Sequence, residues 1–184
     1  MENIVIVDCI RTGLAKSHRG TFNMTRSDDL VAHCIDALLT RNPQLDPAQV
    51  DDVVLGCGRQ IGEQSGNVAR HAVALSQLPI TVPATTISRA CSSGLNSIAI
   101  AATQIASGCA EIMLAGGVES ITGLSRGTPG EFAENPRLMS EKPDMHMAMG
   151  NTAEVVARRY QVTREAQDAY ALSSQQRYAA AEAA

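Results

Sequence analysis

Residues 84–101, ATTISRACSSGLNSIAIA, are predicted to form a short strand, a turn that carries Cys91, and the first turns of a helix. Residues 84–87 are a β-prone run, and after Cys91 the apolar residues Leu95 and Ile98 recur at the spacing of a helix face. A strand that leads directly into a helix is the repeating unit of α/β folds. The turn also poses a chemical question, because Cys91 is either a nucleophile or a small buried packing residue.

The same alternation extends over most of the chain. Strands are predicted at residues 4–7, 53–55, 84–87 and 112–115, and the first of these runs, IVIV, is typical of a buried strand. Helical patterns separate the four runs. Strands that alternate with helices predict an α/β fold with a mostly parallel sheet.

Capping residues predict where the first two helices begin and end. Thr25 and Asp28 have the spacing of a capping box, and the helix that they begin is expected to end at Asn42. Asn67 is predicted to cap a second helix, which stops at Leu78 because a proline follows.

The third helix is predicted to run from Cys91 to a stop at Gly108. Residues 90–110 contain no charged side chain, but they include polar groups and little bulk. This composition favours a helix buried on all sides over a membrane span.

The pattern changes after residue 120. Residues 121–148 lack sustained periodicity, which in a compact domain is often a sign of function. Helices are predicted to start at Asn151 or Thr152, with Glu154 in a capping box, and at Thr163. The last helical pattern reaches the final residue without a stop signal, so we expect the chain to be incomplete.

Composition excludes several classes of function. The chain has 184 residues, 45% of them hydrophobic and 18% charged, with a formal net charge of −4, so it carries no electrostatic footprint for nucleic acid. Its five cysteines form no CxxC pair, which argues against a disulfide framework or a zinc site. We expect a reducing, cytoplasmic setting, without a secretion signal at the start of the chain.

Cys91 is the candidate catalytic residue. A thiol in the first turn of a helix lies where unpaired N–H groups and the helix dipole favour the thiolate. Such a thiolate can attack a thioester, and the N–H groups can bind the oxyanion that forms. The other four cysteines are predicted to be structural: Cys9, Cys34, Cys57 and Cys109.

Four segments in register resemble one protein family. Residues 87–101, ISRACSSGLNSIAIA, resemble the nucleophile motif of the thiolases, and residues 115–120, AGGVES, are similar to that family's Gly-Gly-x-Glu-Ser segment. Residues 149–154, MGNTAE, match its Met-Gly-x-Thr-Ala-Glu segment, and IVIVDCIRT resembles its opening strand. Together the four cover essentially the whole chain.

The resemblance implies a thiolase-like layered fold, with helices on both faces of the sheet and an inserted loop domain. Residues 1–120 would form the N-terminal α/β half and residues 121–184 the start of the loop domain, with the C-terminal half absent. It further implies a homodimer or tetramer of fatty-acid metabolism that handles acyl-CoA thioesters. Coenzyme A would be a co-substrate, and no metal or redox cofactor is implied.

In that family the motif cysteine, here Cys91, accepts an acyl group from 3-ketoacyl-CoA, and acetyl-CoA leaves. A second CoA then takes the shortened acyl chain, or the reaction runs backwards as a Claisen condensation. The acid/base cysteine and histidine belong to motifs of the C-terminal half, and the four histidines of this chain match neither motif. We therefore expect this chain alone to be inactive.

Two residues of the chain depart from the family pattern. Gly13 replaces a usual proline, which affects loop stiffness. Ala148 stands where biosynthetic short-chain thiolases commonly carry histidine, which favours the degradative 3-ketoacyl type of β-oxidation. By the same analogy Met149 lines the acyl or pantetheine pocket, the alternative being a packing residue at a helix start.

Two other functions stay open from the sequence. A β-ketoacyl synthase shares the fold and often has Ala-Cys-Ser-Ser at its nucleophile, although the segments at residues 115–120 and 149–154 favour a thiolase. A non-catalytic dimerisation or interaction module is the alternative from another class, because the acid/base half is missing.

Overall fold

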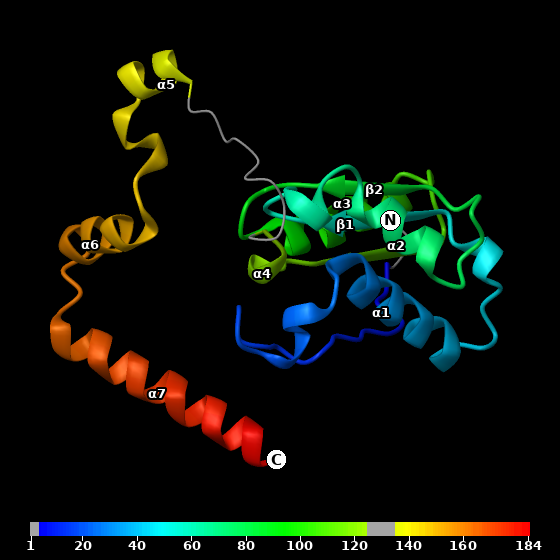
Figure 1. The fold of residues 1–184 in the computed structure, drawn as a ribbon, viewed down its shortest axis with the longest axis horizontal. Helices are drawn as coiled ribbons and strands as arrows, with labels where there is room; N and C mark the ends of the chain where they lie inside the picture. The colour runs from blue at the N-terminus through cyan, green and yellow to red at the C-terminus, as the bar shows by residue number, and fades with distance from the viewer. Residues whose placement is uncertain (1–3, 125–134) are drawn as a thin grey trace. The chain divides into compact units, whose positions relative to one another are not determined.

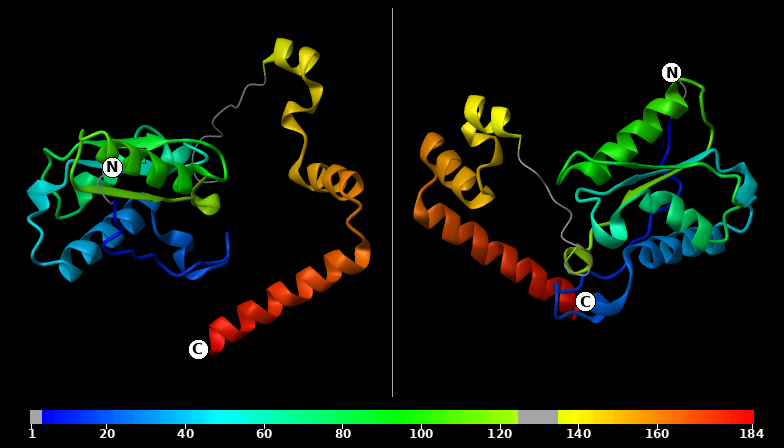
Figure 2. Two further views of the ribbon diagram at one scale, coloured as in Figure 1. Left: turned by 180° about the vertical axis from the view of Figure 1, so that it is seen from behind. Right: turned by 45° about the horizontal axis from the view of Figure 1, so that its top comes forward.

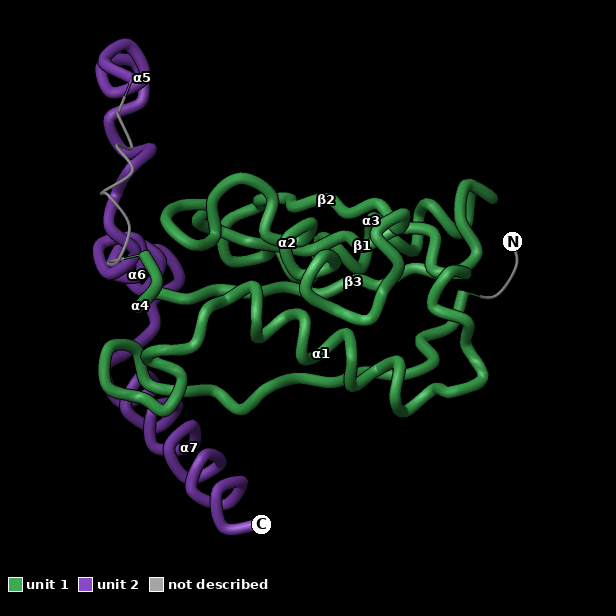
Figure 3. The backbone as a smooth tube through the Cα atoms, turned by 45° about the vertical axis from the view of Figure 1, so that its right-hand side comes forward, with its two compact units in different colours: residues 1–131 green, residues 132–184 purple. Residues whose placement is uncertain are grey.

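The structure is a computed structural model that describes residues 4–124 and 135–184. The chain divides into two compact units, residues 1–131 and residues 132–184 (Figure 3). The first unit contains a sheet with helices, and the described part of the second contains helices alone. The assignment of residues 121–184 to an inserted loop domain stays a prediction.

The sheet of the first unit has three parallel strands in the order β2-β1-β3 (Figure 1). The strands are β1 (Asp52–Gly56), β2 (Ala84–Ile87) and β3 (Met113–Gly117). In the strand register Gly56 pairs with both Ile87 and Gly117, so the carboxyl ends of all three strands lie at one edge. The predicted parallel sheet is confirmed.

Helices cover both faces of this sheet. In the right-hand view of Figure 2, α3 lies on one side and α2 with α1 on the other. The α-helices of the first unit are α1 (Ser27–Arg41), α2 (Val68–Leu75), α3 (Ser93–Ala106) and the short α4 (Ile121–Leu124). Its 3-10 turns are η1 (Thr21–Met24), η2 (Pro47–Gln49) and η3 (Gly62–Gln64). This three-layer arrangement confirms the predicted fold class.

The core lies between the sheet and the α1–α2 layer. Apolar side chains from all three elements are buried there, including Ile35, Val53, Val68 and Val73. On the same layer the Asn67 side chain caps α2 by accepting the Arg70 N–H at 3.2 Å, as predicted. The helix ends at Leu75 rather than at Leu78, because the backbone is already extended at the next residue.

The predicted buried strand at residues 4–7 is wrong. These residues have no strand assignment, and their side chains are 41–80% exposed. A β-branched run becomes a strand only where a neighbour supplies hydrogen bonds to its backbone. No described strand pairs with it, and Cys9 therefore ends no strand.

Two predicted capping boxes are also wrong. The N-cap of α1 is Arg26, and Asp28 forms an ion pair with Arg26 at 2.8 Å instead of a cap with Thr25. Burial of the Asp28 carboxyl opposes its ionisation, yet the hydrogen bonds and charge of Arg26 hold the pKa of Asp28 below its usual value. In the second unit α6 starts at Met149 with no side-chain cap.

The prediction that the third helix is buried on all sides is wrong as well. Helix α3 buries a stripe of small residues against the sheet, Ser93, Ser97 and Ala101, and leaves Leu95 73% exposed. Ile98, one helical turn further along the same face, is 42% exposed. Gly108 ends the helix with a φ of +75°, as predicted.

The second unit consists of helices whose described residues are all partly or fully exposed. Its helices are α5 (Pro136–Glu141), α6 (Met149–Arg159) and α7 (Arg164–Ala183), with the 3-10 turn η4 (Pro143–His146) between the first two. Thr163 caps α7 by accepting the Ala166 N–H at 3.2 Å, which confirms the predicted start. Among the described residues, no helix is both long and apolar enough to cross a membrane.

Candidate functional site

Cys91 lies in the turn between β2 and α3, at the carboxyl edge of the sheet. Cys91 is exposed and lies two positions before Ser93, the first residue of α3. The helix therefore starts two residues later than predicted. Ligands of parallel α/β sheets bind at this same edge, beyond the carboxyl ends of the strands.

Ser93 braces the turn that carries the cysteine. Its hydroxyl accepts the Arg89 N–H at 2.8 Å and donates to the Ala90 carbonyl at 2.7 Å. The N–H groups of Ser92 and Ser93 donate to the carbonyls of Arg89 and Ala90, each at 3.1 Å. These two N–H groups are thus engaged within the turn, and oxyanion binding by other N–H groups near Cys91 stays a prediction.

Ala90, the residue before the cysteine, has a left-handed backbone with a φ of +47°. This region costs a residue with a Cβ about 1 kcal/mol or more, and such strain clusters at functional sites. The surrounding hydrogen bonds of Ser93 hold the conformation in place. The turn therefore presents Cys91 in a conformation that the local chain does not prefer.

Three glycines let the start of α3 approach the sheet closely. A Cβ added to Gly56 would overlap the backbone of Ser93, and one added to Gly117 would lie 3.1 Å from the Cα of Gly94. Backbone therefore touches backbone where β1 and β3 end. Larger side chains at these positions would push the cysteine turn away from the strand ends.

A hollow of about 600 Å³ adjoins Cys91 at this edge. Its walls come from the ends of β1 and β3 and from the cysteine turn. The lining residues are Gly56, Gly58, Arg59, Ala90, Cys91, Ser93, Gly94, Gly117, Val118, Glu119 and Ile121. The hollow is lined by the Cys91 side chain together with one cationic side chain, Arg59, and one anionic side chain, Glu119.

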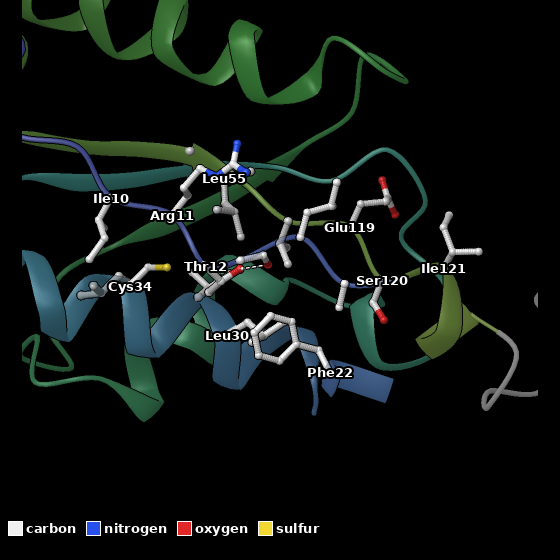
Figure 4. Close-up of a pocket in the computed structure, with 18 of the residues that line it drawn as sticks. Ile10, Arg11, Thr12, Phe22, Leu30, Cys34, Leu55, Glu119, Ser120 and Ile121 are labelled. Atoms are coloured by element: carbon white, nitrogen blue, oxygen red, sulfur yellow. Dashed lines mark hydrogen bonds between the residues drawn. The ribbon is translucent and has the colours of Figure 1, made fainter. Parts of the chain in front are cut away.

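A second hollow, of about 500 Å³, lies between α1, the N-terminal segment and β3 (Figure 4). Apolar side chains such as Phe22, Leu30 and Leu55 line much of it, and Cys91 does not. In Figure 4 the Glu119 carboxylate points away from Phe22 and Leu30. The hollow beside Cys91 is the candidate site, because the exposed Cys91 lines it.

The other cysteines differ from Cys91 in their surroundings. Cys57, which directly follows β1, is fully buried, and burial together with the charge of Glu119 raises its pKa to about 11. Burial also raises the pKa of the Cys34 thiol. Cys9 and Cys109 are exposed but do not line the hollow around Cys91.

The four histidines lie elsewhere. His18, His33, His71 and His146 are all exposed, and none of them lines the hollow around Cys91. Among the described residues, no cluster of three or more His, Cys, Asp or Glu side chains could hold a metal ion. The hollow thus places a thiol in a site without a histidine.

Met149, the second predicted site residue, is the first residue of α6 in the second unit. Because Met149 is 72% exposed, it is not a packing residue within that unit. Its contact with an acyl or pantetheine group stays a prediction.

Sequence reasoning gave no role to Arg59, Gln64 or Glu119. Arg59 and Glu119 follow β1 and β3 closely, so the rule that points to the carboxyl ends of parallel strands could have found them. Gln64 gives no such signal, because a buried glutamine in a short turn looks like any polar loop residue.

Sequence comparisons with known proteins identify the relatives of this chain. A sequence model of the family described as "Thiolase, N-terminal domain" matches residues 4–184. A 3-ketoacyl-CoA thiolase of Erwinia tasmaniensis is 42% identical over 98% of this chain and 46% of its own length. The proteins of the same name from Pseudoalteromonas translucida and Escherichia coli O139:H28 are each 41% identical, over 98% and 96% of this chain.

The coverage of these relatives is one-sided. The chain spans about half the length of the curated relatives that it matches. It covers 46% of the Erwinia and Pseudoalteromonas proteins and 45% of the Escherichia coli protein. The similarity therefore extends over nearly all of this chain and over less than half of each relative.

Proposed function

Because this chain belongs to the thiolase family through its N-terminal domain, we propose that it is part of an acyltransferase that cleaves 3-ketoacyl-CoA with coenzyme A. The products would be acetyl-CoA and a shortened acyl-CoA, and the reverse reaction would be a Claisen condensation. Cys91 would carry the acyl group as a covalent thioester between the two half-reactions.

The observation that carries this proposal is the position of Cys91. It is exposed in a braced turn at the carboxyl edge of the sheet, and a hollow of about 600 Å³ lies beside it. The buried Cys57, at the end of the neighbouring strand, has no such access. An accessible thiol beside a hollow is the minimum that a covalent acyl carrier needs.

The proposed reaction has two half-reactions, both at Cys91. The Cys91 thiolate attacks the ketone carbon of 3-ketoacyl-CoA, and the bond between that carbon and the α-carbon breaks. The bonding electrons leave with acetyl-CoA as its enolate, which takes up a proton. The thiol of a second CoA then loses its proton, attacks the acyl-cysteine and releases the thiolate.

No histidine lines this hollow, and the Glu119 carboxylate is held by the Gly58 N–H and the Gln64 amide, so we propose that groups beyond the hollow transfer the protons. By family resemblance a cysteine and a histidine of the C-terminal half would serve, on the same polypeptide or on a second one. The oxyanion of the attack also needs donors other than the N–H groups of Ser92 and Ser93. We therefore propose that this chain alone does not turn over.

The remaining parts of the proposal follow from the resemblance. CoA is a co-substrate, Met149 contacts the acyl or pantetheine part, and the complete enzyme is a homodimer or tetramer of the cytoplasm. The degradative direction, in β-oxidation, is the favoured one because Ala148 replaces a histidine.

The test uses the complete protein that contains this chain. It is incubated with a 3-ketoacyl-CoA and CoA, and acetyl-CoA is quantified by liquid chromatography. Formation of acetyl-CoA at a rate that depends on both reactants is the expected result. Reaction with acyl-carrier-protein thioesters alone would identify a β-ketoacyl synthase, and no reaction with either substrate would favour a non-catalytic module.

A further inference from the structure

The carboxylate of Glu119 joins segments that are far apart in the sequence. Its Oε2 accepts the Gly58 N–H at 2.8 Å, and its Oε1 accepts a hydrogen bond from Gln64 Nε2 at 2.9 Å. Gly58 lies in the turn after β1, Gln64 in η3, and Glu119 after β3. One side chain thus ties together three loops at the carboxyl edge of the sheet.

Gln64 completes this connection. Its side chain is fully buried, and Nε2 donates to the Arg59 carbonyl at 2.8 Å as well as to Glu119. Its Oε1 accepts the Ser120 N–H. Because both ends of the amide have fixed partners, the side chain has one orientation that satisfies it.

The tied segments form a wall of the hollow beside Cys91. Gly58, Arg59 and Glu119 line that hollow. A Cβ added to Gly58 would lie 2.8 Å from Glu119 Oε2 and 3.2 Å from the Ala90 carbonyl oxygen. The Gly58 turn is therefore held between the Glu119 carboxylate and the residue before the cysteine.

We propose that Glu119 is a positioning residue for the Cys91 site and that it acts through Gln64 and the Gly58 turn. This inference rests on the proposed acyl transfer to Cys91. Glu119 need not touch the reacting atoms, because it fixes the wall against which a thioester substrate would lie. A loose wall misplaces the substrate, and a misplacement of about 1 Å can cost up to 10²-fold in rate.

The isosteric change Glu119→Gln tests this role sharply. Glu119 accepts two hydrogen bonds from two donors, whereas glutamine has one acceptor and one donor. Whichever way its amide turns, an NH₂ group faces either the Gly58 N–H or the Gln64 NH₂ group. One of the two connections is lost without a change in side-chain volume.

The experiment measures two reactions of Cys91 in the complete protein. Acylation by acetyl-CoA is followed by intact mass, and alkylation by iodoacetamide is followed by peptide mapping. Glu119→Gln is expected to slow acylation about tenfold or more, while alkylation by the small reagent stays within about twofold. The matched control is Glu111→Gln, an exposed glutamate between α3 and β3, which should change neither rate.

Buried Cys57 serves as an internal reporter of unfolding. If Glu119 only stabilised the fold, its loss would expose Cys57 and raise the alkylation of Cys57 in parallel with the change at Cys91. The proposal predicts that Cys57 stays unreactive in Glu119→Gln, because burial still excludes the reagent although the loss of the Glu119 charge removes one cause of the raised Cys57 pKa. A parallel rise would overturn the positioning role.

A reversed pair provides the rescue. In the double variant Glu119→Gln with Gln64→Glu, the N–H groups of Gly58 and Ser120 keep their acceptors, and the two exchanged side chains still hydrogen-bond to each other. The hydrogen bond to the Arg59 carbonyl is lost. Partial recovery of acylation is expected. Wild-type acylation in Glu119→Gln would overturn this inference alone, whereas no acylation of the wild-type protein would overturn the proposed function and this inference with it.

Discussion

The ends of β1 and β2 carry one cysteine each, and the two sites differ in almost every physical respect. Cys57 follows β1 directly, is fully buried, and has a pKa raised to about 11 by burial and the charge of Glu119. Cys91 follows β2 in an exposed turn, after the left-handed Ala90. Two neighbouring strand ends thus carry a buried thiol and an accessible one. The conformation of the chain after each strand makes the difference.

The largest expected difference between the two ends is chemical. Cys91→Ala should lower acyl transfer in the complete protein by about 10³-fold or more, because the acyl carrier is removed. Cys57→Ala should keep the turnover of folded enzyme within about twofold and lower the free energy of unfolding by about 1 kcal/mol. Steady-state thiolysis and urea denaturation measure the two effects. Equal losses of activity in both variants would remove the distinction.

The next largest effect concerns the close approach of α3 to β1. In Gly56→Ala the new Cβ would overlap the Ser93 backbone, so α3 must shift and the free energy of unfolding should fall by about 3 kcal/mol. Gly13→Ala is the control, since nothing lies within 4 Å of its Cβ, and it should change stability by less than about 0.5 kcal/mol. Urea denaturation of both variants checks this, and a tolerated Gly56→Ala would contradict the tight contact.

The pH dependence of stability should report on Cys57. Its folded pKa is raised, so its contribution is fully present below the pKa of an unfolded thiol, about 8.5, and is lost as the pH rises toward about 11. Over this window the free energy of unfolding should fall by about 2 kcal/mol more in the wild type than in Cys57→Ala. Denaturation curves from pH 8 upward measure the difference, and parallel curves would show that Cys57 ionises without penalty.

The smallest expected effect tests the turn before Cys91. Ala90→Gly relieves the left-handed strain but adds freedom to the unfolded chain, so stability should rise by about 0.5 kcal/mol. Ala90→Val places a β-branched residue at a φ of +47° and should lower stability by about 1 kcal/mol. Because Ala90 is exposed, changes in burial do not obscure the comparison. A loss of stability in Ala90→Gly as well as in Ala90→Val would show that the backbone at Ala90 is not strained.

Much of the fold was predictable because the strands of the sheet find their pairing partners within residues 52–117. The run at residues 53–55 pairs with the runs at residues 84–87 and 112–115, so local pattern and tertiary context agree. The run at residues 4–7 has the same propensity and no described partner, and it forms no strand. Propensity alone could not reveal that difference.

The candidate site was predictable only in part, for a related reason. Cys91 stands out in the sequence because it follows a strand and precedes a helix. Gly58 and Glu119 reach the same hollow through the pairing of Gly56 with Gly117, a register that no local pattern contains. The buried Gln64 joins them through hydrogen bonds that only the folded chain brings together.

Peptide mapping of an acetyl label tests the central claim most directly. The complete protein is incubated with acetyl-CoA, quenched in acid, digested and analysed by mass spectrometry for acetyl groups on each of the five cysteines. The account predicts acetylation of Cys91 and an unmodified Cys57. A label on another cysteine, or an unlabelled Cys91 in a protein that cleaves 3-ketoacyl-CoA, would contradict it.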